Sequence, residues 1–109
     1  MAKNSKDLTP VILIHPGETL REELKARNIK QIEFAQIIGV TPAWINMLIK
    51  GANKINTKAA YLIAAGLNMD PDLWLNLQRN YEIDRLKKDK AFQKKLKAVG
   101  VRKWVVETK

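Results

Sequence analysis

The chain has 109 residues, of which 46% are hydrophobic, and its 20 Lys and Arg against 11 Asp and Glu give a formal net charge of +9. This length suits one domain, and the hydrophobic fraction is too high for a disordered chain. The absence of Cys excludes disulfides and thiolate metal sites, and it fits a reducing cytoplasm. With one His and no phosphate-binding glycine loop, we expect no metal, no cofactor and no enzyme, but a basic protein with an anionic partner.

The charge is unevenly distributed along the chain. Residues 30–69 have a net charge of +3 and residues 70–84 one of −3, whereas residues 85–109 carry ten basic and two acidic side chains, net +8. No apolar run approaches the roughly 18–20 residues of a membrane span. Residues 1–10 are not followed by the apolar region of a signal peptide. We therefore predict a cytoplasmic protein whose electrostatic attraction is concentrated in its C-terminal segment.

Helix signals recur along the chain, whereas strand signals are few. Thr41-Pro42 and Asp70-Pro71 each combine an N-cap side chain with proline at the first helical position, and Gly39 and Gly51 are suited to end the helices before them. Apolar residues at helical spacing predict helices at 17–27, 31–38, 42–50, 57–67 and 71–88, with one further short helix at 90–98. Only Val11–Ile14 and Trp104–Val106 fit strands better.

Residues 31–50, QIEFAQIIGVTPAWINMLIK, predict two short helices joined by a turn at Gly39. Ala35 is small where the helices cross, Gly39 allows a positive φ, and Ile45 and Leu48 hold the second helix on the core. This combination is the pattern of a helix-turn-helix. An ordinary pair of antiparallel helices in a bundle is the alternative interpretation.

Two further segments resemble a known family. The run IHPGETLREEL (14–24) and the run DPDLWLNLQRNYEIDRLK (70–87), on either side of the motif, are similar to the HigA-type antitoxins of the Xre/Cro repressor-like group. The resemblance implies an all-α, five-helix, lambda-repressor-like DNA-binding domain at 14–88, with an N-terminal arm (1–13) and a basic C-terminal extension (89–109). It also implies a homodimer that represses its own operon at a palindromic operator and neutralises a RelE/HigB-like mRNA endonuclease toxin.

In helix-turn-helix proteins the second helix of the motif enters the major groove of double-stranded DNA. With Ile45 and Leu48 facing inward, the exposed side of that helix and its flanks provide the candidate DNA contacts. These are Gln31, Thr41, Pro42, Ala43, Asn46, Met47, Lys50, Asn53 and Lys54. Lys30 stands where related repressors place a Ser or Thr cap, so we expect a lost cap and a gained phosphate-seeking charge.

The predicted reading helix departs from the family pattern. Pro42, Ala43 and Met47 are apolar where related repressors carry Ser, Arg or Gln, so they cannot form bidentate hydrogen bonds to bases. Thymine methyl groups could pack against them, and Asn46 could read adenine. Alternatively, with Trp44, this apolar surface could serve a protein contact instead of DNA.

Outside the motif, His15 precedes a helix and is expected to fix or cap the chain, not to catalyse a reaction. Trp74 is expected in the core or in a dimer interface, and Leu77 and Tyr81 suit a dimer face on the same helix. The basic tail from Arg85 has three interpretations: a solvated face, a contact with DNA phosphates, or a contact with the partner protein. Because RelE-like toxins are generally basic, we favour the first two.

Two alternatives to the antitoxin hypothesis stay open. One is a helix-turn-helix transcriptional regulator without a toxin partner, and the other is a protein-interaction module that has lost DNA binding.

Overall fold

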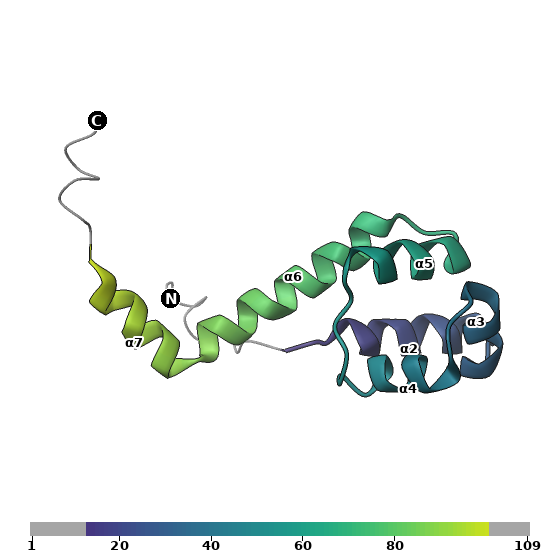
Figure 1. The fold of residues 1–109 in the computed structure, drawn as a ribbon, viewed down its shortest axis with the longest axis horizontal. Coiled ribbons are helices and arrows are strands. Elements are labelled where there is room, and N and C mark those ends of the chain that lie inside the picture. Colours follow the sequence, from purple (N-terminus) through teal and green to yellow (C-terminus); the bar gives the residue numbers. More distant parts are fainter. Residues whose placement is uncertain (1–12, 101–109) are drawn as a thin grey trace, which may run out of the picture.

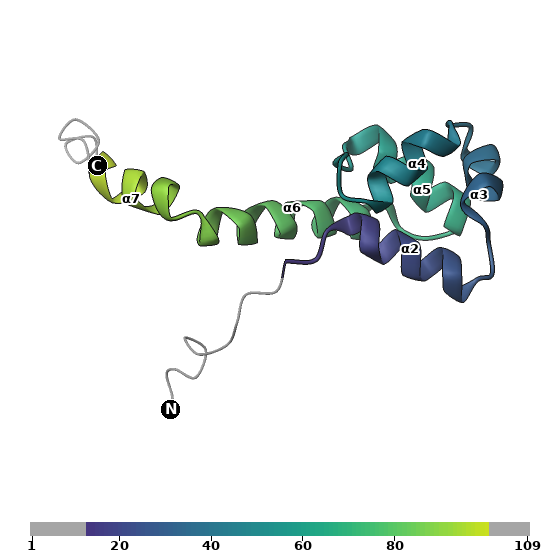
Figure 2. The same ribbon diagram turned by 90° about the horizontal axis from the view of Figure 1, so that it is seen from below.

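The computed structural model describes residues 13–100, and its regular structure in this range is entirely helical (Figures 1 and 2). The helices are α2 (Pro16–Ala26), α3 (Gln31–Ile38), α4 (Pro42–Ile49), α5 (Thr57–Leu67), α6 (Pro71–Lys88) and α7 (Lys90–Val99). The all-α prediction is therefore confirmed. The count of five is replaced by six in this part of the chain, because the short helix expected at 90–98 forms as α7 where a basic extension was assigned.

The strand predictions are not supported where they can be compared with the structure. Leu13 and Ile14 are described and belong to no strand, because they lead directly into the cap of α2. The remainder of Val11–Ile14 and the whole of Trp104–Val106 lie outside the described residues.

Local capping explains why the helix ends agree with the sequence. Thr41 Oγ1 accepts a hydrogen bond from the Trp44 N–H (3.1 Å), and Asp70 Oδ1 accepts one from the Asp72 N–H (2.9 Å). The side chain of Lys30 provides no cap, as expected, but Glu33 Oε1 accepts from the Lys30 N–H at 2.9 Å. Half of a capping box thus remains at the start of α3.

The hydrophobic core lies between α2, α3, α4, α5 and the first turns of α6. Phe34, Leu20 and Trp74 are its largest members, and all three are fully buried. Figure 1 shows α6 leaving this body and carrying α7 at its far end. The helical body is therefore compact around the core, and the second half of α6 with α7 forms an arm.

A very close backbone approach in the body lies between Gly17 on α2 and the end of α4. A Cβ atom added at Gly17 would collide with the carbonyl oxygen of Leu48 and would lie 2.9 Å from the Cα of Ile49. Only a residue without a side chain lets the two backbones meet at this distance. Gly17 therefore sets how closely α4 is held against α2.

His15 joins the start of α2 to α6. Its Nδ1 accepts a hydrogen bond from the Gly17 N–H (2.9 Å), so it is the N-cap of α2, as the sequence predicts. The His15 ring meets the Tyr81 ring edge-on, with 4.9 Å between the two ring centroids. The guanidinium carbon of Arg85 lies 5.7 Å from the centroid of the Tyr81 ring. Burial lowers the pKa of His15 below its ordinary value of 6.5; Arg85 also lowers it, while a hydrogen bond with the Asn53 backbone and the charge of Glu18 oppose the shift.

Replacement of Gly17 by alanine is expected to lower the free energy of unfolding by about 3 kcal/mol, since the new methyl group has no room against rigid backbone. Lys25→Ala, on the exposed side of the same helix, is the matched control and should change it by less than about 0.5 kcal/mol. Urea denaturation followed by circular dichroism measures both. Equal stability of Gly17→Ala and wild type would contradict the close approach.

The unfolding free energy is expected to decrease as the pH falls from about 7.5 to 5.5. The reason is that the folded-state pKa of His15 is depressed, so the unfolded chain binds more protons between the two pKa values. His15→Asn keeps an N-cap acceptor without an imidazole, so its stability should vary less across this pH range. Chemical denaturation at several pH values tests this, and superimposable pH profiles for the two proteins would refute it.

Candidate nucleic-acid interface

Helices α3 and α4 form the predicted helix-turn-helix. They are joined by residues 39–41 and are bent by 116° from one another, within the roughly 90–120° typical of this motif. Gly39 ends α3 with a φ of +76°, and Val40 donates its N–H to the carbonyl of Ala35 at 3.0 Å. Ala35 is fully buried, as its place at the helix crossing requires.

The core holds α4 by one side only. Ile45 and Leu48 are fully buried, which confirms that these two residues anchor the helix. Pro42 occupies its first turn, and Gly51 just after it has a φ of +84°. The opposite side of α4 is therefore presented to solvent over its whole length.

The structure brings most of the predicted DNA-contact residues together on this outer side. Ala43 and Lys50 are exposed, Met47 is 46% exposed, and Asn46 is half-buried beside them. Thr41 and Pro42 are exposed at the start of α4, and Gln31 is exposed at the start of α3. The part of this face on α4 is apolar at Pro42, Ala43 and Met47, and Lys50 provides its cationic side chain.

Trp44 does not belong to the exposed apolar surface of α4, contrary to the expectation from the sequence. Its side chain is half-buried and packs against the core. Although it directly follows Ala43, Trp44 lies on a different side of α4, toward α5, where it lines a hollow with Leu62. The exposed apolar surface of α4 thus reduces to Pro42, Ala43 and Met47.

The loop after α4 carries the last two predicted contacts, and α6 supports it from behind. Lys54 is exposed and Asn53 is half-buried. Gln78 supplies the support: its Oε1 accepts a hydrogen bond from the Ile55 N–H and its Nε2 donates to Glu82 Oε2, both at 2.8 Å. Sequence reasoning missed Gln78, although a glutamine between apolar residues on the inner side of α6 was a usable signal.

The predicted dimer residues on α6 need one correction. Trp74 is fully buried within the core, so its side chain is not available to a second copy of the chain. Leu77 and Tyr81 are half-buried, and Tyr81 is in contact with His15. Leu73, one turn before Leu77, is 39% exposed.

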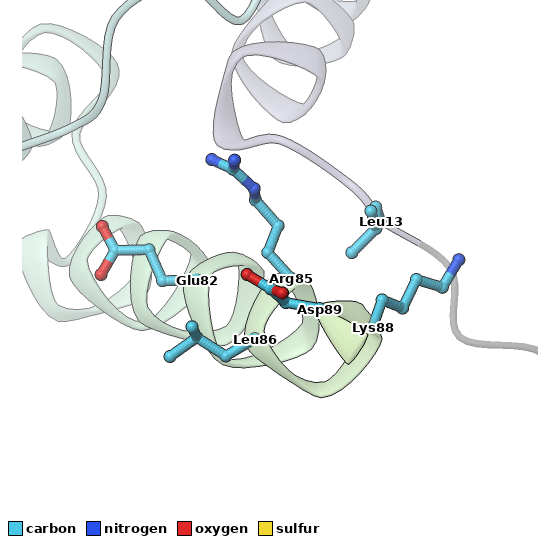
Figure 3. A pocket seen from close by; sticks show the side chains of 6 residues that line it. All are labelled: Leu13, Glu82, Arg85, Leu86, Lys88 and Asp89. Carbon is cyan, nitrogen blue, oxygen red and sulfur yellow. The ribbon is translucent and has the colours of Figure 1, made fainter. Parts of the chain in front are cut away.

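One hollow of the described chain lies away from the helix-turn-helix, at the end of α6 (Figure 3). It has a volume of about 490 Å³ and is lined by Leu13, Glu82, Arg85, Leu86, Lys88 and Asp89. Figure 3 shows Arg85 extending toward the segment that leads into α2. Its lining combines side chains of both charges with two leucines.

Two further observations concern residues 13–100. No group of three His, Asp or Glu side chains in this range could hold a metal ion. No single helix here is long and apolar enough to cross a membrane; α3 and α4 together would reach that length and composition, but they are sharply bent at their turn.

Comparison with known proteins gives concordant matches. The sequence model of the helix-turn-helix family matches residues 20–74. Virulence-associated protein I of Dichelobacter nodosus is 33% identical over 78 residues, which are 71% of this chain and 72% of that protein. An addiction module antidote protein of the HigA family from Coxiella burnetii is 30% identical, with a TM-score of 0.72 over 83% of this chain and 97% of that one.

A further solved structure contains nucleic acid. PA4674 of Pseudomonas aeruginosa, in complex with its operator DNA, is 27% identical, with a TM-score of 0.65 over 68% of this chain and 81% of that one. The family match includes both helices of the motif and the start of α6. The chain therefore belongs to the helix-turn-helix family, in the group that includes the HigA-type antidote proteins.

Proposed function

We propose that this protein is a sequence-specific DNA-binding autorepressor and the antitoxin of a type II toxin–antitoxin module. The observation that carries the DNA-binding part is the exposed outer side of α4, presented beyond a 116° turn by a core that holds only its inner side. In this family geometry α4 enters the major groove, and the start of α3 meets the sugar–phosphate backbone.

Base recognition would be shared between one polar and several apolar side chains. Asn46 can form a bidentate hydrogen-bond pair with adenine, and Ala43, Met47 and Pro42 can pack against thymine methyl groups. Gln31, Thr41, Lys50, Asn53 and Lys54 lie around them and would contact phosphates, which position the protein without reading sequence. Specificity would then depend strongly on half-site spacing and on the shape of the DNA.

The antitoxin part of the proposal rests on the HigA-family antidote protein, whose length the match spans almost completely. The toxin expected beside it is a RelE/HigB-like mRNA endonuclease, and the complex would act in the cytoplasm. A transcriptional regulator without a toxin is the second candidate, supported by the 26% identity to the E. coli HTH-type regulator YddM.

The operator is proposed to be a palindrome bound by a homodimer. Leu73 and Leu77 are at positions i and i+4 of α6, so they lie on the same side of the helix, and both retain exposed apolar surface. Tyr81 adds to the same helix, although its ring already contacts His15. A second copy of α6 would cover this surface and place two copies of α4 on one side of the duplex.

Asn46→Ala is expected to weaken binding to a duplex from the protein's own promoter by about tenfold, since a bidentate base contact is worth about 1–3 kcal/mol. Binding to a scrambled duplex should stay unchanged. Lys54→Ala is the matched control: it should weaken both by a similar factor, because phosphates carry no sequence. Fluorescence anisotropy measures the four affinities, and a preserved preference for the promoter in Asn46→Ala would contradict the role of Asn46.

Expression of the neighbouring gene alone should arrest growth. Co-expression of the protein described here should restore growth, and the two proteins should co-purify. The purified protein alone should sediment as a dimer at tens of micromolar. Normal growth with the neighbouring gene alone would favour the regulator without a toxin. A protein that sediments only as a monomer would contradict the proposed homodimer.

A further inference from the structure

Helix α7 carries two rows of side chains on different sides. Lys90, Lys94 and Lys97 follow one another at i, i+4 and i+7, which places them in one line along the helix. Phe92, Leu96 and Val99 repeat the same spacing two residues later, so they lie on a different side. This helix of 10 residues thus carries three lysines on one side and three apolar residues on another, and Lys95 lies between the two rows.

Contacts with α6 determine which side of α7 faces outward. Gln93 Nε2 donates to the carbonyl oxygen of Leu86 at 2.7 Å, and Phe92 and Gln93 are the half-buried residues of α7. These two residues turn toward the end of α6. The three members of the lysine row are exposed and take no part in this contact.

The lysine row has no carboxylate that neutralises it within residues 13–100. The ion pairs in this range are Arg21–Glu22 and Arg27–Glu23, both on α2. Asp89 is the nearest acidic residue, and its Oδ1 accepts the Phe92 N–H at 3.0 Å as the cap of α7. The row therefore presents positive charge that suits an external polyanion.

We propose that the lysine row of α7 binds the phosphates of the same DNA duplex that α4 reads. This inference rests on the proposed DNA-binding function. The outer side of α4 supplies only Lys50 as a cation, so its surface provides little of the electrostatic attraction on which DNA affinity depends. The row spans about 10 Å at 1.5 Å per residue, a length that corresponds to about three phosphates of one strand.

The position of α7 relative to α4 supports a single duplex as the ligand. In Figure 1, α4 and the junction between α6 and α7 both lie along the lower edge of the molecule, and Figure 2, seen from below, shows both without another helix in front. The 18 residues of α6 make it about 27 Å long. One turn of B-DNA is about 34 Å, so a duplex that contacts α4 and runs along this edge would come within reach of α7.

The test is the salt dependence of binding to the promoter duplex. For the full-length protein, the slope of log K against log salt should fall by about 0.9 for each phosphate contact that is lost. The triple variant Lys90→Gln, Lys94→Gln and Lys97→Gln should therefore reduce the slope by about 2–3 and weaken binding at least tenfold at low salt. Glutamine keeps the helix propensity, and circular dichroism checks that α7 and the melting temperature are retained.

A matched pair of single variants distinguishes an effect of the position of the charge on α7 from an effect of the total charge of the protein. Lys94→Gln and Arg79→Gln each remove one positive charge, but Arg79 lies on α6 and is held by Asn76 Oδ1 at 2.8 Å. Lys94→Gln should reduce the slope by about one, and Arg79→Gln should leave it unchanged. Equal reductions in the two variants would mean that net charge matters and not the row, which would overturn the proposal.

The remaining outcomes distinguish this proposal from the function on which it rests. If the triple variant keeps both the wild-type slope and the preference for the promoter, the lysine row does not touch DNA, while the repressor function stands. If wild-type protein shows no preference for the promoter over scrambled DNA, the repressor function itself is wrong. Lysine-dependent binding to phosphatidylglycerol vesicles with an unchanged DNA slope would assign the row to lipid and overturn the proposal.

Discussion

The backbone contact between Gly17 and the end of α4 is the constraint on which the arrangement of this molecule depends. The two helices approach so closely there that a single methyl group has no space. Such an approach fixes the distance between α2 and the end of α4, because rigid backbone cannot yield as a flexible side chain can. The outer side of α4 owes its position to this contact, and so does the course of the loop that follows.

Helix α6 completes that arrangement from the other side. His15 caps α2 and rests on Tyr81, and Gln78 accepts the N–H of Ile55 at the end of the loop after α4. Both contacts connect the first and middle parts of the chain to one helix. The long helix is thus a support for the DNA-binding surface as well as the base of an arm that carries α7.

The side chains proposed to read DNA bases and most of the positive charge lie in different parts of this protein. The side of α4 that would read DNA is mostly apolar, while the cations are concentrated in the C-terminal segment, where residues 85–109 have a net charge of +8. A division of this kind assigns shape and methyl contacts to one element and phosphate attraction to another. It also explains why net charge alone gave no information about the position of the reading helix.

The sequence by itself determined the positions of the helices and the helix-turn-helix. Caps such as Thr41 and turn residues such as Gly39 act within three or four residues, so their effect can be read locally. Periodicity likewise identified Ile45 and Leu48 as the buried side of α4.

Only the tertiary structure decided the roles of residues that depend on distant partners. It placed Trp74 wholly in the core, turned Trp44 toward α5, and buried Gln78 against the N–H of Ile55, 23 residues away in sequence. It also made Gly17 a contact residue instead of a simple helix start. Burial and close approach depend on which remote segments meet, and no local pattern in the sequence records that.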